Sequence, residues 1–245
     1  MNARRILRLT GKDTEDFLQG LVTNDVRKLD QGLVYAALLT PQGKYIADFF
    51  LLRDGDGVLL DVAEPLADDL LRRLSMYKLR ADVRIEPTPL GVRRGTGPAP
   101  EAALADPRHP SLGWRHYGDF ESSDDGTDWD ALRVAQVIPE TGIELTPDSF
   151  ILETGFEALN GVDFRKGCYV GQEVTARMKH KTELRKGLRQ VVVEGEAEPG
   201  TEILAGGKSA GTLLTRSGDR AIAYLRLDRA TEGMTAGTAT VRLEQ

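Results

Sequence analysis

Blocks of apolar residues separated by turn residues run through the first 86 positions and predict six secondary-structure elements. Residues 10–26, "TGKDTEDFLQGLVTNDV", have the apolar stripe of a helix, with Asp13 as its cap and Asp16 as the partner in a capping box. The elements predicted after it are the strands 33–40, 44–53 and 58–63, the helix 65–80 and the strand 81–86. The order helix, three strands, helix, strand predicts an α+β fold with an antiparallel sheet.

The rest of the chain divides into loops, one short helix and a strand-rich end. Residues 95–110 are rich in Pro, Gly and Ala and residues 121–128 are acidic, so both predict surface loops, while residues 128–137 predict a short helix. Five strand-like runs with glycine-containing turns follow towards the C-terminus and predict a small β-barrel. We therefore expect two domains, residues 1–184 and residues 185–245.

Composition argues against several classes of protein. The chain has 32 Lys and Arg against 38 Asp and Glu, a formal net charge of −6, whereas a general nucleic-acid binder usually has a basic surplus. No apolar run approaches the ~20 residues of a membrane span. The N-terminal stretch turns acidic before a signal-peptide core could form, so we expect a cytoplasmic protein with no membrane association.

Cys168 is the only cysteine in 245 residues and lies in the polar segment "RKGCYVGQEVTAR", residues 165–177. One cysteine excludes an internal disulfide, and it excludes a zinc site built from four cysteines or from two cysteines and two histidines. The three histidines, His109, His116 and His180, do not lie at a metal-ligand spacing. A metal held by this chain would therefore need ligands from another molecule.

Three interpretations of Cys168 compete. It could be a small buried apolar residue, as free cysteines often are, although its neighbours Arg165 and Lys166 are polar. It could be a nucleophile with His180 as its base, but nothing local orients that histidine. It could also be a ligand that the chain donates to a shared metal ion or cluster.

The neighbours of Cys168 are compatible with a ligating thiolate. The thiolate is the form of cysteine that binds metals, and a nearby cation such as Lys166 favours it. Gly167 and Gly171 permit the positive-φ backbone that would expose the side chain on a loop. A helix starting near Gln172 would direct the positive end of its dipole toward the sulfur.

The segment "KGCYVGQE", residues 166–173, resembles the signature of the YgfZ-type folate-binding proteins, which are relatives of the glycine-cleavage aminomethyltransferase, or T-protein. The resemblance also covers the segments "GKDTEDFLQGLVTNDV", "LLTPQGKYIADFFL", "KLRADVRIE" and "IPETGIELTPDSFILETGFEALNGVDFRKGCY". The continuation "GQEVTAR" is similar to the mitochondrial branch of that family, which matures iron–sulfur proteins.

The resemblance implies an α+β fold of antiparallel-sheet, ferredoxin-like modules around a central cavity where folate sits, plus a C-terminal small β-barrel. It implies a role in assembling or repairing iron–sulfur clusters, chiefly of the four-iron type, with carrier or scaffold proteins and four-iron client enzymes as partners. Cys168 would be the cluster ligand and Lys166 the second reactive residue. The residues implied for binding a tetrahydrofolate cofactor are Trp129, Asp48, Lys44, Tyr169, Gln172 and Glu173.

The chain departs from the T-proteins where these carry carboxylates for one-carbon chemistry. Ala47 stands where T-proteins have the first Asp of an Asp-Asp pair, and Ala135 or Gln136 stands where they have a glutamate. Without these groups, acid–base help to the folate nitrogen is lost. The sequence therefore favours a non-enzymatic maturation factor over the alternative, a tetrahydrofolate-dependent transferase of the aminomethyltransferase type. A nucleic-acid-binding module is opposed by the acidic net charge.

Residues 177–189, "RMKHKTELRKGLR", hold six Lys or Arg and a single acidic residue, Glu183. One interpretation is an ordinary solvated surface. The other is a patch that attracts an acidic partner, a polyglutamate tail or an anionic cluster complex. RNA is opposed because no stacking aromatic residues alternate with these charges.

Overall fold

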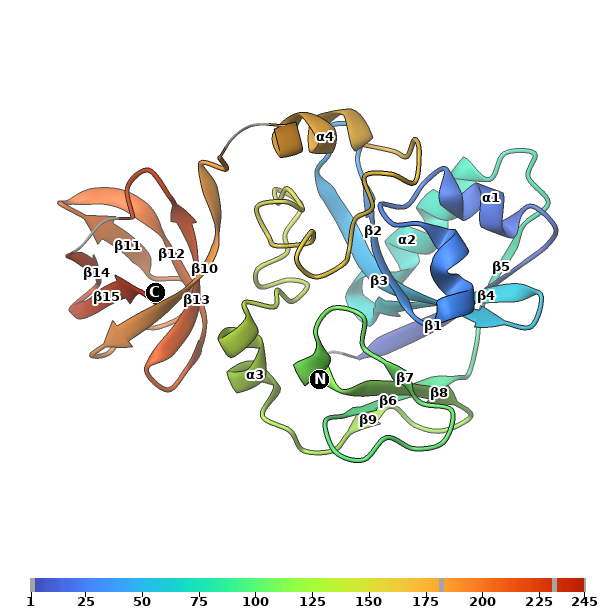
Figure 1. Ribbon diagram of the computed structural model, residues 1–245, viewed down its shortest axis with the longest axis horizontal. Helices are drawn as coiled ribbons and strands as arrows, with labels where there is room; N and C mark the ends of the chain where they lie inside the picture. Colours follow the sequence, from blue (N-terminus) through green and yellow to red (C-terminus); the bar gives the residue numbers. More distant parts are fainter. Residues whose placement is uncertain (1–2, 181–182, 231–232, 245) are drawn as a thin grey trace. The chain divides into compact units, whose positions relative to one another are not determined.

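Figure 1 shows the computed structural model of the chain. The residues that the structure describes are 3–180, 183–230 and 233–244. The chain folds into two compact units, one made of residues 1–127 and 157–174 and the other of residues 128–156 and 175–245. Each unit has its own cluster of buried apolar side chains.

The first unit is built on a five-stranded antiparallel sheet with the order β2-β3-β4-β1-β5. Its strands are β1 (Arg4–Thr10), β2 (Val34–Leu39), β3 (Tyr45–Asp54), β4 (Gly57–Ala63) and β5 (Arg84–Pro87). Two α-helices, α1 (Thr14–Gln19) and α2 (Glu64–Tyr77), connect β1 to β2 and β4 to β5, the former through a 3₁₀-helix, Val26–Gln31. The predicted α+β class and antiparallel sheet are confirmed.

Strands β2, β3 and β4 are almost continuously apolar and buried, which is typical of strands that are covered on both faces. On one face, Ala47, Phe49 and Leu51 of β3 pack in a core that also contains Leu70 and Leu74 of α2. Because side chains alternate along a strand, Asp48 and Phe50 of β3 lie on the opposite face. The helix side is therefore apolar, and the other side contains polar groups.

A second, smaller sheet of the first unit contributes polar groups to this other side. It has the order β7-β8-β6-β9. Its strands are β6 (Gly91–Gly95), β7 (Leu104–Ala105), β8 (Trp114–Gly118) and β9 (Ser123–Asp124), and a 3₁₀-helix, Pro110–Leu112, lies between β7 and β8. Arg115 of β8 reaches Asp61 of β4, with 2.8 Å between Nη2 and Oδ2. The two sheets are thus joined by a buried ion pair.

The second unit contains a closed six-stranded barrel with the order β10-β13-β12-β11-β14-β15. Its strands are β10 (Lys186–Glu194), β11 (Glu202–Ala205), β12 (Lys208–Ser217), β13 (Arg220–Arg226), β14 (Met234–Ala236) and β15 (Ala239–Leu243). The predicted C-terminal barrel is confirmed, but the number of five strands is wrong. The three-residue strand β14 is too short to leave a pattern of alternating apolar residues.

Helix α3 (Trp129–Gln136) packs against the barrel within the second unit. Val134 of α3 contacts Leu188 and Ile222 in a small apolar cluster. Glu144 is fully buried, and its carboxylate accepts from the Thr215 hydroxyl at 2.5 Å and pairs with Arg133 at 2.5 Å. Residues 129–144 are therefore held against the barrel by apolar contacts and by the hydrogen bond from Thr215 to the buried carboxylate of Glu144.

The predicted opening helix is shorter and capped differently. Helix α1 has only six residues, and the Asp13 side chain makes no cap hydrogen bond to it. Instead, Asp13 Oδ2 accepts from the backbone N–H of Asp82, 2.8 Å away, so the capping box with Asp16 is wrong. The strand β1 before it was not predicted, and neither were β6 and β8. No helix in the described part of the chain is long and apolar enough to cross a membrane.

Candidate cysteine-loop site

Residues 166–169, the cysteine loop, present one exposed thiol between two buried side chains. Cys168 is exposed, whereas Lys166 and Tyr169 are only 6% and 7% exposed. Gly167 has φ 100°, a conformation that favours glycine, and it turns the chain outward directly before the cysteine. The interpretation of Cys168 as a buried apolar residue is therefore wrong, and its predicted exposure on a loop is what the structure has.

The Lys166 side chain is directed away from solvent, under the end of helix α1. Its Nζ donates to the carbonyl oxygen of Gln19 and to that of Val22, the latter at 2.8 Å. Carbonyls at the end of a helix carry partial negative charge and favour a cation there. Burial lowers the pKa of Lys166 to about 8, against the opposing effects of Asp25 and Asp163.

Gln19 returns the contact. Its Nε2 donates to the Lys166 carbonyl at 3.2 Å and to Asp25 Oδ1 at 3.1 Å, and its Oε1 accepts from the Val26 N–H at 2.9 Å. The Lys166 ammonium also lies 5.1 Å from the centre of the Tyr169 ring, within the range of a cation–π contact. Lys166 thus anchors the start of the cysteine loop to the end of α1, and the buried Tyr169 ring lies against the Lys166 ammonium.

Helix α4 (Gln172–His180) begins four residues after Cys168, as predicted, with Glu173 in its first turn. Gly171, φ 84°, approaches the turn of the β2–β3 hairpin so closely that an added Cβ would lie 2.6 Å from the Thr40 carbonyl oxygen. Gly43, φ 76°, faces it from the hairpin, and a Cβ there would lie 2.8 Å from Cβ of Val174. Two glycines at the contact therefore fix the segment after the cysteine loop against the hairpin.

Of the other predicted site residues on the hairpin, Asp48 is buried and hydrogen-bonded. Its Oδ2 accepts from the hydroxyl of Tyr35 at 3.0 Å and its Oδ1 from that of Tyr45 at 2.6 Å. Burial and then the charge of Asp48 raise the pKa of Tyr35 well above its ordinary value. Lys44 is half-buried, and its backbone N–H donates to the Thr40 hydroxyl at 3.1 Å in the hairpin turn.

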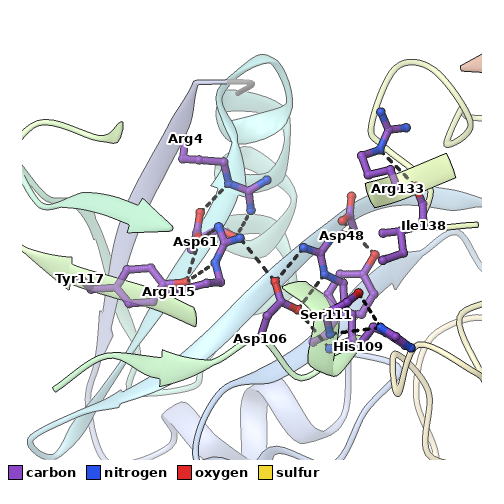
Figure 2. A network of polar contacts seen from close by, with 12 residues as sticks. Arg4, Asp48, Asp61, Asp106, His109, Ser111, Arg115, Tyr117, Arg133 and Ile138 are labelled. Atoms are coloured by element: carbon purple, nitrogen blue, oxygen red, sulfur yellow. Dashed lines mark hydrogen bonds and ion pairs between the residues drawn. The ribbon is translucent and has the colours of Figure 1, made fainter. Parts of the chain in front are cut away.

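A network of buried charges that the sequence analysis did not find lies on the same face of the sheet as Asp48 (Figure 2). Asp61 is fully buried and accepts from Arg4 at 2.7 Å, from Arg115 at 2.8 Å and from the Tyr117 hydroxyl at 2.8 Å. Burial would raise the pKa of Asp61, but the two arginines outweigh it and lower the pKa. Arg115 Nη1 is also 3.7 Å from Asp106. The partners of Asp61 lie 54 to 57 residues away in the sequence, so no local sequence pattern predicts these contacts.

The ring of Phe50 lies at the centre of this network. Arg115 and Arg108 lie 4.1 Å and 4.9 Å from the ring centre, and Arg4 lies 5.8 Å away. Arg108 also pairs with Asp106 at 2.8 Å. Cations over an aromatic ring stabilise a partly desolvated network of this kind.

The remaining predicted site residues are distributed over both units. Tyr169 and Gln172 belong to the first unit, as do Lys44 and Asp48. Trp129 belongs to the second, where it is the half-buried first residue of α3, and Asp128 caps that helix by accepting from the Ala131 N–H at 3.0 Å. A folate site made from residues of both units stays a prediction.

The predicted basic patch falls on the end of α4 and the start of β10. Arg177 and Lys179 are exposed in the last turns of α4, and Arg185 lies just before β10. Lys181 is outside the described residues. The attraction of an acidic partner to this patch stays a prediction.

The chemistry that the site offers is that of one accessible sulfur. Among the described residues, no group of three or more His, Cys, Asp and Glu side chains is placed to hold a metal ion. Iron in a cluster is commonly held by several cysteine thiolates, and this chain has one cysteine. The site can therefore supply one ligand of a set.

The chain has the fold of the glycine cleavage aminomethyltransferase. It superposes on the glycine cleavage system aminomethyltransferase T from Bartonella henselae with a TM-score of 0.78 and 13% sequence identity, covering 98% of this chain and 82% of that one. Residues 185–245 match the family described as CAF17, C-terminal beta-barrel domain. The likeness to the aminomethyltransferase concerns the fold alone.

Sequence comparison is more specific. The chain is 30% identical over 277 residues to the iron–sulfur cluster assembly factor IBA57, mitochondrial, of Mus musculus, covering 92% of this chain and 76% of the mouse protein. The human protein of the same name is 29% identical with the same coverage. A homologue from Mycosarcoma maydis is 33% identical, and the match covers 75% of this chain but only 54% of the fungal protein. The chain belongs to the IBA57 family of iron–sulfur cluster assembly factors.

Proposed function

We propose that this chain assists iron–sulfur cluster assembly by lending the Cys168 thiolate, as one ligand, to a cluster held jointly with a carrier or scaffold protein. The single observation that carries this proposal is the exposure of Cys168 between two buried neighbours. A lone cysteine cannot complete a cluster, and an exposed one can reach iron bound elsewhere. The cluster is cargo, and four-iron client enzymes would receive it.

The ligand step is an exchange without electron transfer. The Cys168 thiol loses its proton to solvent, and its sulfur bonds to one iron of the carrier-bound cluster. The ligand that leaves this iron takes up a proton. Oxidation states of iron and sulfide are unchanged, so neither an oxidant nor a reductant is needed.

Lys166 acts in this proposal as a positioning residue. Its ammonium is occupied by the carbonyls of Gln19 and Val22, so it fixes the loop instead of carrying protons for the thiol. The fixed loop reduces the conformational freedom that the Cys168 side chain loses when it binds iron. We therefore assign Lys166 the role of positioning the cysteine loop, in place of the catalytic role that the sequence analysis expects.

The experiment uses the purified chain, a cluster-loaded carrier protein from the same organism, and visible absorption and circular dichroism as readouts. Wild type is expected to change the cluster spectrum at a 1:1 ratio, and Cys168→Ala is expected to leave it unchanged. Cys168→Ser serves as a matched variant, because a hydroxyl of similar size keeps the loop but binds iron poorly. Equal spectral changes with all three proteins would contradict the proposal.

We propose tetrahydrofolate binding as a second function, which the resemblance to the YgfZ-type folate-binding proteins implies. Each carboxylate oxygen of Asp48 accepts a tyrosine hydroxyl, so this side chain is held in position within the first unit. Ala47 packs in the apolar core on the opposite face of β3. A carboxylate at position 47 would therefore not lie beside Asp48, and its absence removes no group from the face of the sheet that carries Asp48. An alanine at position 47 therefore does not by itself oppose a transferase.

We propose that a folate is bound with Trp129 as the stacking residue, and that it has no part in chemistry. Calorimetry with tetrahydrofolate polyglutamates should give binding to wild type and at least tenfold weaker binding to Trp129→Ala. Release of formaldehyde or ammonia from an aminomethyl donor would instead support the transferase alternative. The relatives named above are mitochondrial by name, and the cytoplasmic location of this chain stays a prediction.

A further inference from the structure

The corner between helix α2 and strand β5 carries two apolar side chains in contact with water. Leu79 is 88% exposed, and Met76, one helical turn before it, is 60% exposed. No other large hydrophobic residue that the structure describes is exposed to this degree; the next are Ile143 at 43% and Leu243 at 39%. Removing such side chains from water is favourable, so they are suited to an interface.

The backbone at Leu79 is also unusual. Leu79 has φ 42°, in the left-handed region that favours glycine, and it follows Lys78, the C-cap of α2. Glycine is the usual residue at this place after a helix, because a Cβ is unfavourable there. A leucine that accepts backbone strain without packing in its own fold is typical of a functional position.

The corner presents a positive charge in a chain whose net charge is −6. Of the five Lys and Arg in residues 72–84, Arg72 and Arg73 are paired with Asp69, and Arg84 lies 4.0 Å from Glu86. Arg80 directly follows Leu79, is exposed, and forms neither a hydrogen bond nor an ion pair with a described residue. Lys78 is held by the Val83 carbonyl at 3.1 Å. The surface therefore complements an acidic one.

Helix α1 connects this corner to the cysteine loop (Figure 1). At its start, Asp13 accepts from the N–H of Asp82 at 2.8 Å, which fixes the corner. At its end, Gln19 and Lys166 bond to each other. Six helical residues span about 9 Å, so the two surfaces are attached to opposite ends of one short, rigid element.

We propose that the α2–β5 corner docks the protein that shares the cluster with Cys168, through an acidic surface with an apolar recess that receives Leu79 and Met76. This inference rests on the proposed function. A typical interface buries ~800 Å² on each partner, a patch roughly 30 Å across, which is wide enough to cover both ends of α1.

A protein fits the corner better than an anionic membrane does. Membrane-surface helices expose a continuous apolar face. In α2 that face, with Ala67, Leu70 and Leu74, is packed in the core of the first unit. Among the large apolar side chains that the structure describes at this corner, only Met76 and Leu79, at the C-terminal end of α2, are exposed to solvent. Two such side chains can insert into a recess on a folded partner.

The test measures the affinity of the purified iron–sulfur carrier of the same organism for the full chain and three variants. Leu79→Gly should weaken binding at least tenfold while the melting temperature stays equal or rises by about 2–4 °C, because the backbone strain is relieved. Arg80→Glu should also weaken binding, and the loss of affinity should be larger at low salt than at high salt. Leu243→Thr, at an exposed leucine of strand β15, is the matched control and should bind as wild type does.

Each outcome distinguishes the docking surface from the proposed function. Binding of the carrier to wild type and equally to Leu79→Gly and Arg80→Glu overturns the docking surface and leaves the role of Cys168 standing. Absence of carrier binding to wild type overturns both. Binding to phosphatidylserine vesicles that is lost in Leu79→Gly, with carrier binding unchanged, would assign the corner to a membrane and contradict the proposal.

Discussion

Gln19 and Lys166 hold each other by two hydrogen bonds, although 146 residues separate them in the sequence. The Lys166 ammonium donates to the Gln19 carbonyl, and the Gln19 side-chain amide donates to the Lys166 carbonyl. This reciprocal pair joins the end of α1 to the start of the cysteine loop. The position of Cys168 is therefore set by helix α1 and not only by its own neighbours.

Replacing Lys166 with methionine should loosen the cysteine loop. Lys166→Met keeps the volume but removes the donors to the carbonyls of Gln19 and Val22, so the cysteine loop loses its side-chain hydrogen bonds to the end of α1. Hydrogen exchange at residues 167–169 should become faster. Lys208→Met, at an exposed lysine of β12, is the control; unchanged exchange in the loop of Lys166→Met would contradict the anchoring role.

The same lysine predicts a pH dependence of stability. Burial lowers the pKa of Lys166 to about 8 in the folded chain, from 10.5 without it. Between these values the unfolded chain binds more protons, so Lys166 makes the folded state more stable as the pH rises from 8 to 10.5. Below pH 8 the unfavourable burial of the ammonium is fully present.

Chemical denaturation at several pH values tests this dependence. The stability of wild type relative to Lys166→Met should increase by about 1–3 kcal/mol between pH 8 and 10.5, because the variant lacks the titrating group. Subtracting the variant removes the effect of all other groups that titrate in the same range. A constant difference between the two proteins would show that the Lys166 pKa is not lowered.

Gly171 should tolerate no side chain. Gly171→Ala places a Cβ 2.6 Å from the Thr40 carbonyl oxygen, so we expect a loss of more than about 2 kcal/mol in unfolding free energy. Gly142 has the same φ, 84°, with nothing within 4 Å of an added Cβ. Gly142→Ala should therefore lose only about 1 kcal/mol from backbone conformation. Equal losses in the two variants would mean that the contact with the hairpin is unimportant.

The buried network around Asp61 should be sensitive to loss of its central charge. Asp61→Asn removes the carboxylate that pairs with Arg4 and leaves Arg115 only the more distant Asp106, and the expected loss of unfolding free energy is about 3–5 kcal/mol. Glu244→Gln breaks an exposed pair with Arg220 and should leave the thermal midpoint nearly unchanged. If Asp61→Asn melts together with wild type, the network does not hold the two sheets together.

The features that the sequence predicts correctly are those that depend on residues close together in the chain. Pro41 and Gly43 correctly predict the hairpin between β2 and β3. The start of helix α4 is also predicted correctly, directly after Gly171. The exposure of Cys168 was predicted from Gly167 and Gly171, and both have positive φ. Backbone geometry that requires glycine is visible in a single sequence, because few other residues can replace it.

The features that sequence missed depend on distant residues. Strand β1 was missed because "RRILRLT" is short and rich in arginine, yet Arg4 is needed to pair with Asp61 of β4. The predicted capping role of Asp13 is wrong because its carboxylate accepts from the backbone N–H of Asp82, in the segment between α2 and β5. Lys166 was interpreted by its nearness to Cys168 in sequence, while its partners Gln19 and Val22 are brought to it only by folding.

The central claim is that the Cys168 sulfur bonds to iron of a cluster shared with a carrier. Because Cys168 is the only cysteine, selenocysteine at position 168 labels this atom uniquely. X-ray absorption at the selenium edge should then be recorded for the labelled chain in complex with the cluster-loaded carrier. We predict an iron neighbour of selenium that is absent without the carrier; a spectrum with carbon as the only neighbour in the formed complex would contradict the account.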